Sequence, residues 1–159
     1  MRTGWSFWLL MAVLVVLHFA LHLSFGLGAS APDLLTVAVL LAARQLHGGR
    51  AAAFGFALGL LEDAVSLSAF GAAAVVQTVI GYLGARSRDF FVGDSLLFLA
   101  AYLFLGKWAR DALYYGVAEV VRRGDAVGAL LLRAPVAGLY AAAAGVVAII
   151  AYRSLTRLR

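Results

Sequence analysis

Apolar residues fill this chain in six blocks, separated by short stretches of polar or small residues. The blocks lack the strict polar and apolar alternation of a membrane barrel strand. Only helices and closed barrels satisfy their backbone hydrogen bonds inside lipid, so the blocks predict transmembrane helices. We expect an all-α integral membrane protein, a six-helix transmembrane bundle in a single domain over residues 1–159, with helices at about 5–27, 32–46, 51–65, 72–85, 95–121 and 129–152.

The first block is long enough to span a bilayer, and Trp5 and Trp8 provide aromatic anchors at its start. Residues 29–31, Ala-Ser-Ala, are typical of a signal-peptide cleavage site. However, the apolar stretch exceeds the usual length of a signal-peptide core, and Pro32 follows the site directly. We therefore expect a retained first membrane helix.

The second, third and fourth blocks are shorter than the roughly 20 residues of a full span. The second block opens on Pro32 and Asp33, where the proline ring fixes a helical φ and the acid complements the helix dipole. Its apolar stretch, residues 34–43, spans only if the following polar residues extend the helix. Gly48 and Gly49 are expected to turn the chain. The short blocks are therefore either short helices inside a bundle or include one re-entrant segment.

Composition supports a membrane location. The 159 residues are 64% hydrophobic and 13% charged, whereas a soluble domain is about 25% charged. The net charge of +5 lies mostly between apolar blocks, where it sets topology, so no nucleic-acid partner is expected. One set of alternate loops carries Arg2, Arg44, Arg50, Arg86, Arg88, Arg153, Arg157 and Arg159, and the other carries Arg122 and Arg123. The first set predicts that both termini are cytoplasmic.

Glu62 and Asp63 lie near the outer end of the third block. An ionised carboxylate at membrane depth costs about 2.5 to 3.5 kcal/mol, so it normally faces protein or water. One interpretation is a proton or ion site, or a polar contact to a partner. The other is a carboxylate paired with an Arg or Lys of a neighbouring helix.

The fifth block carries three charged residues near its middle. Lys107 and Asp111 are four residues apart and share a helix face, so they can neutralise one another. Arg110 is then left over, and a desolvated guanidinium seeks a bidentate acceptor. We expect Arg110 or Lys107 to meet Asp63 or Glu62, so that the third and fifth helices pack through this pair.

Two further spacings suggest contacts rather than chemistry. His18 and His22 are four apart and could chelate a metal on one helical turn, but no third ligand is obviously placed, so we expect packing or hydrogen bonding and no metal site. Gly55 and Gly59 form a small-xxx-small pair that lets another helix approach closely, either a partner's or one of this chain.

Signatures of catalysis are missing from the sequence. We find no nucleophile elbow, phosphate loop, dinucleotide fingerprint or zinc-protease motif. The chain has no cysteine, which excludes a disulfide, a thiol nucleophile and a Cys-ligated metal. We therefore expect no catalytic residue, no cofactor and no enzymatic activity.

Several short motifs together resemble the rod shape-determining protein MreD family over residues 31–84. They are Pro32-Asp33-Leu34-Leu35, the Gly55-Phe56-x-x-Gly59-Leu60-Leu61-Glu62-Asp63 helix end, Phe70-Gly71 and Ile80-Gly81-Tyr82. Glu62 departs from the family pattern, in which an apolar residue precedes the aspartate. This departure leaves open which acid has the family role. Arg122 and Arg123 in an outside loop also depart from the expected topology.

The resemblance implies a small component of the bacterial inner membrane that takes part in cell elongation. Such proteins act with MreC, the MreB cytoskeleton, and the RodA and class B penicillin-binding protein complex that builds peptidoglycan. The implied fold is similar to the six-helix substrate-binding component of energy-coupling-factor transporters. A vitamin-binding transport subunit is thus the alternative, but it would need a pocket under long outside loops, and the first two outside turns are short. We expect the membrane helix of an MreC partner near Gly55 and Gly59.

Overall fold

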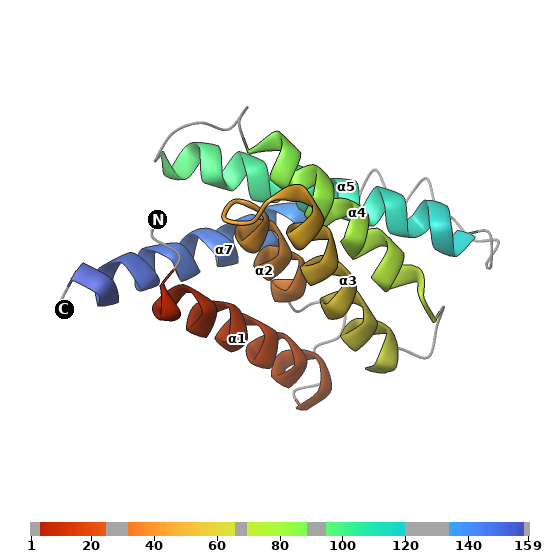
Figure 1. Cartoon of the computed structure of the whole chain (residues 1–159), viewed down its shortest axis with the longest axis horizontal. Coiled ribbons are helices and arrows are strands. Elements are labelled where there is room, and N and C mark those ends of the chain that lie inside the picture. The colour runs from red at the N-terminus through yellow and green to blue at the C-terminus, as the bar shows by residue number, and fades with distance from the viewer. Residues whose placement is uncertain (1–3, 25–31, 66–69, 89–94, 120–133, 158–159) are drawn as a thin grey trace.

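The computed structural model describes residues 4–24, 32–65, 70–88, 95–119 and 134–157 (Figure 1). These residues form six α-helices and no strand, which confirms the expected all-α fold for this part of the chain. The first helix continues as a π-helical turn, η1 (Ala20–Ser24). The helices are α1 (Trp5–Phe19), α2 (Leu34–Ala43), α3 (Gly48–Val65), α4 (Ala72–Ser87), α5 (Leu96–Glu119) and α7 (Ala134–Arg157).

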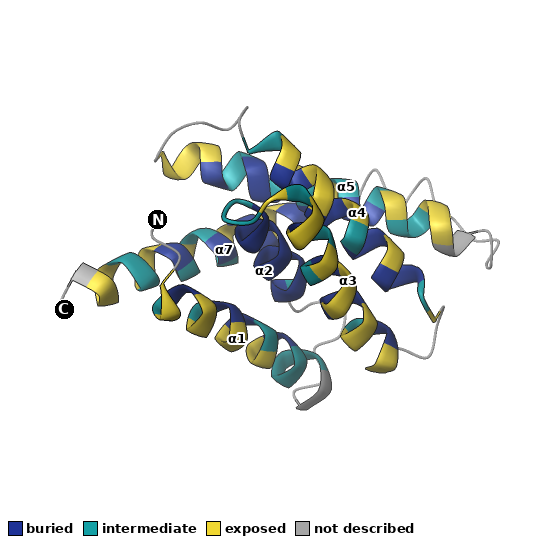
Figure 2. Cartoon of the chain, in the orientation of Figure 1, coloured by how far each residue is buried: buried dark blue, intermediate teal, exposed yellow. Residues whose placement is uncertain are grey.

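Helix α2 lies at the centre of the bundle. All 10 of its residues are buried, and α1, α3, α4, α5 and α7 each pack against it (Figure 2). Ten residues are about 15 Å of helix, half of a hydrocarbon core of about 30 Å. The short length is tolerated because protein, not lipid, surrounds this helix on all sides. Asp33 begins it, accepting the Thr36 N–H at 3.0 Å.

Helices α3 and α4 lie side by side as an antiparallel pair (Figure 1). The chain turns before α3 at residues 44–47, and Gly48 and Gly49 are the first residues of the helix. The expectation that this glycine pair makes the turn is therefore wrong. The Ala51 N–H donates to the His47 carbonyl at 2.9 Å, so helical hydrogen bonding already begins at His47.

Membrane character varies among the helices. Two stretches of the described residues are long and apolar enough to cross a bilayer by themselves, Trp5–His22 and Ala134–Thr156. Helix α5 is equally long, but it carries Lys107, Arg110 and Asp111 in its middle. The outer faces of α1 and α7 are exposed (Figure 2), and they carry apolar residues such as Val16 and Val147. Such continuous apolar surface suits lipid better than water.

Candidate functional site: a buried polar network

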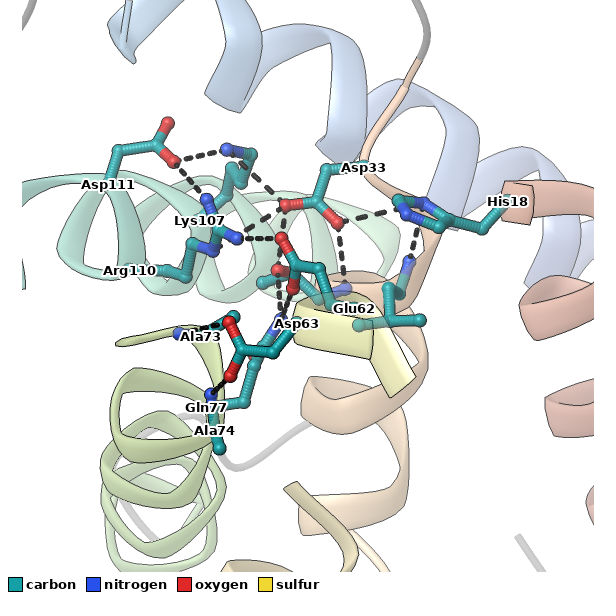
Figure 3. A network of polar contacts seen from close by, with 12 residues as sticks. His18, Asp33, Glu62, Asp63, Ala73, Ala74, Gln77, Lys107, Arg110 and Asp111 are labelled. Atoms are coloured by element: carbon teal, nitrogen blue, oxygen red, sulfur yellow. Dashed lines mark hydrogen bonds and ion pairs between the residues drawn. The ribbon is translucent and has the colours of Figure 1, made fainter. Parts of the chain in front are cut away.

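Charged and polar side chains from five helices meet at the N-terminal end of α2 (Figure 3). At this level the C-terminal part of α3 contacts both the first turn of α4 and the middle of α5. The network comprises His18 from α1, Asp33 and Thr36 from α2, Glu62 and Asp63 from α3, Gln77 from α4, and Lys107, Arg110 and Asp111 from α5.

Arg110 joins α5 to α3. Its Nη2 donates to Glu62 Oε1, and its Nη1 donates to Asp111 Oδ1 at 3.3 Å. The guanidinium carbon also lies 4.8 Å from the centre of the Tyr114 ring. The pair expected between α3 and α5 is present, and Glu62 is the acid that makes it. The expected pair within α5 is present as well, because Lys107 Nζ donates to Asp111.

Asp33 is a second acceptor for the cations of α5. Its Oδ2 lies 3.4 Å from Lys107 Nζ and 3.9 Å from Arg110 Nε. The same oxygen accepts the Thr36 hydroxyl at 2.8 Å. From the sequence we expected this acid only to begin a helix. It does so, and it also ties α2 to α5.

Asp63 has a different role from its neighbour Glu62. Its two oxygens accept the N–H groups of Ala73 at 3.1 Å and Ala74 at 2.9 Å, in the first turn of α4. These N–H groups have no partner within their own helix, and the helix dipole is positive there. The N-cap residue, Gly71, has a φ of 92° and no side chain to offer. Asp63 therefore caps α4 from the adjacent helix, and only 1% of its surface is exposed.

Gln77, Thr36 and His18 also belong to the network, and of these three we expected only His18 to form a polar contact. Gln77 Nε2 donates to Thr36 Oγ1 at 3.0 Å and to Glu62 Oε2 at 3.4 Å. His18 Nδ1 accepts the Leu35 N–H at 3.4 Å and lies 3.9 Å from Asp33 Oδ1. A single polar residue in an otherwise apolar membrane helix usually faces the protein. That signal would have found both Gln77 and Thr36.

The two histidines of the first helix form hydrogen bonds. His22 Nδ1 donates to the His18 carbonyl oxygen at 2.9 Å, and the two rings stack with centroids 4.1 Å apart. Among the residues that the structure describes, no group of three or more His, Cys, Asp or Glu side chains could hold a metal ion.

Glycines form the seam between α3 and α4. A Cβ placed on Gly55 would lie 2.1 Å from the Gln77 carbonyl oxygen, and one on Gly59 would lie 2.5 Å from the Ala73 carbonyl oxygen. Gly81 of α4 faces the Ala51 carbonyl in the same way, at 2.3 Å. Helix α4 thus fills the face that the small-xxx-small pair offers. The expectation that a partner helix packs over Gly55 and Gly59 is incompatible with this packing.

Comparison with known proteins gives a match to a protein family. A family model described as rod shape-determining protein MreD matches residues 2–109, more than half of the chain. The matched residues include α1 to α4 and the first part of α5. No curated protein matched the chain, and no solved structure did. The expected similarity to the energy-coupling-factor component is therefore not supported by a match to a solved structure.

Proposed function

The chain belongs to the rod shape-determining protein MreD family, and from this premise we propose that it is a non-catalytic membrane scaffold of the bacterial cell-elongation complex. In this role it would help to position or regulate peptidoglycan synthesis, together with MreC, with RodA and its class B penicillin-binding protein, and indirectly with MreB. The observation that carries the proposal is the family match over residues 2–109.

The proposed topology has six spans in the inner membrane and both termini in the cytoplasm. Arg44 at the end of α2, Arg50 at the start of α3 and Arg86 at the end of α4 support it, because these helix ends lie on one side of the bundle. Glu62 and Asp63 lie at the other end of α3. Basic residues are retained in the cytoplasm. A periplasm-dependent reporter fused after Arg159 should therefore be inactive, and an active reporter would refute this topology.

The proposed partner contact is the membrane helix of an MreC-type protein, lying on the outward face of α7. Lipid tails give helices no hydrophobic reason to associate, so contact depends on close packing over small residues. Ala143 is exposed on α7 between Tyr140 and Val147, with 53% and 65% of their surfaces exposed. This face is open, whereas the glycine seam of α3 is covered by α4.

The vitamin-binding alternative requires polar groups that are free to meet a ligand. In the network, by contrast, the polar side chains bond one another, and among the described side chains only Gln77 Oε1 and Arg110 Nε are buried without a hydrogen-bond partner. This network therefore does not favour a transport subunit.

Depletion in the native bacterium tests the scaffold role. Loss of this protein should make the cells wider and rounder, and re-expression should restore their shape, with the MreC-type partner recovered from membranes on the same affinity tag. Unchanged cell shape after complete depletion would refute the proposal.

Crosslinking tests the contact face, and the absence of cysteine makes it direct. Single cysteines are introduced by Ala143→Cys on α7, Val13→Cys on α1 and Phe56→Cys on α3, all at outward positions. Each is oxidised with a cysteine placed in the partner's membrane helix. We expect a disulfide only at position 143. Crosslinking at position 13 or 56 instead would refute the assignment to α7.

A further inference from the structure

Among the residues that the structure describes, the buried network contains more negative than positive groups. Asp33, Glu62 and Asp111 are carboxyl groups, and the cations that face them are Lys107 and Arg110. With every group in its ordinary charged form, this set carries three negative and two positive charges. An uncompensated charge inside a protein in lipid is expensive. One carboxylate therefore needs a further positive charge or a proton.

Asp63 and His18, the other titratable side chains described in the network, do not supply it. Asp63 is directed away to the first turn of α4, where two backbone N–H groups hold it as an acceptor. His18 lies 3.9 Å from Asp33, but its Nδ1 accepts the Leu35 N–H. A ring nitrogen that accepts a hydrogen bond carries no proton, so His18 is present as neutral imidazole.

One buried polar atom indicates where the proton belongs. Gln77 Oε1 has no hydrogen-bond partner, and Gln77 is fully buried. The Nε2 of the same side chain donates to Glu62. Thr36 fixes the orientation of the Gln77 amide. The Thr36 hydroxyl donates its hydrogen to Asp33, so its oxygen can only accept, and the group that faces it must be the Gln77 Nε2 donor. The Gln77 amide oxygen therefore has no hydrogen-bond donor near it.

We propose that the network is a proton-binding site in which Glu62 carries the proton as a neutral carboxylic acid. The step is a protonation only: a proton from water adds to a Glu62 carboxylate oxygen, and no other bond is made or broken. The new O–H is a donor for Gln77 Oε1. Asp33 stays an ionised neighbour of Arg110, with its Oδ2 3.9 Å from Nε. Asp33 and Asp111 balance Lys107 and Arg110.

Glu62 is also the carboxyl group that a proton reaches most readily. Its side chain is 21% exposed, against 14% for Asp33 and 10% for Asp111. Among the described residues it also has the fewest cationic partners, because Arg110 alone pairs with it while both cations lie near Asp33 and Asp111.

Infrared spectroscopy of the purified full-length protein in lipid tests the proposal, because a protonated carboxyl group has a C=O stretching band that a carboxylate lacks. At neutral pH the wild type should show this band, and Glu62→Gln should abolish it. The matched control is Asp63→Asn, which removes the neighbouring carboxyl group of the same helix and should leave the band in place. A wild type without the band, or a band that survives in Glu62→Gln, would overturn the proposal.

A second variant covers the case in which Glu62→Gln does not fold. Asp111→Asn leaves Asp33 and Glu62 to balance the two cations, so Glu62 should ionise and the band should disappear although Glu62 is still present. A band that persists in Asp111→Asn contradicts the charge balance.

A melting experiment distinguishes a proton from a metal cation. The melting temperature of the wild-type protein in sodium or potassium chloride is compared with its melting temperature in choline chloride. Equal melting temperatures are expected, and specific stabilisation by the metal cations would mean that a cation, not a proton, neutralises the site.

Discussion

The glycine seam between α3 and α4 gives the most quantitative prediction. In Gly55→Ala, the new Cβ would lie 2.1 Å from the Gln77 carbonyl oxygen, whereas ordinary contact begins at 3.4 Å. The helices must therefore separate locally by up to 1.3 Å, the difference between 3.4 and 2.1 Å. The obstacle is backbone and cannot rotate away, so the cost should lie near the upper end of overpacking, about 2 to 3 kcal/mol. Dispersion contacts along the seam weaken as well.

Thermal unfolding in detergent, followed by circular dichroism, measures this cost. By the usual scaling for a chain of this size, the melting temperature should fall by about 4 to 12 °C. The control is Gly116→Ala in α5, where a Cβ would meet no atom within 4 Å. It isolates the intrinsic helix preference for alanine, about 0.5 to 1 kcal/mol in favour of the variant. If the two variants melted within about 1 °C of each other, the close approach of α3 and α4 would be refuted.

Three further changes probe the same region. Asp63→Ala removes the cap of α4 and should lower stability by about 1 to 3 kcal/mol, measured by the same melting assay; an unchanged melting temperature would contradict the cap. Arg110→Leu leaves Asp33 and Asp111 facing Lys107 alone and should cost about 3 to 5 kcal/mol, partly recovered in the double variant with Asp111→Asn; no recovery would mean that the two residues are not coupled. Gly59→Leu should lower the amount of protein in the membrane, measured by quantitative blotting. A normal amount of protein together with lost recovery of the partner would mean that the partner helix, not α4, packs over Gly59.

The helices were predictable because lipid imposes long apolar blocks. The ranges expected around α4 and α5 differ from the observed Ala72–Ser87 and Leu96–Glu119 by no more than two residues at either end. The end of α7 was expected near residue 152, but the helix continues to Arg157. Long basic side chains can remain helical while their charges reach the headgroups. The expected helix start at 129 lies outside the described residues.

The contact between Arg110 and Glu62 could be predicted from the sequence only as a choice between two acids, Glu62 and Asp63. Glu62 and Asp63 are adjacent, so their side chains leave the helix about 100° apart. Helix α5 lies on one side of α3 and the first turn of α4 on the other, and each acid meets a different neighbour. Which neighbour occupies which side depends on tertiary packing. The sequence contains no local signal for it.

The same physics explains why the glycine pair was assigned to the wrong neighbour. In a soluble protein, polar residues mark the outer face of a helix and apolar residues the inner face. In lipid both faces are apolar, so a stripe of small residues shows that another helix comes close without showing whose helix it is. Polar residues become the marker of the inner face, because lipid excludes them. Gln77 is fully buried, and the α4 backbone at that residue lies against Gly55 of α3. The inward-facing glutamine and the glycine seam therefore lie at one level of the bundle, and a search for isolated polar residues would have assigned the glycines to internal packing.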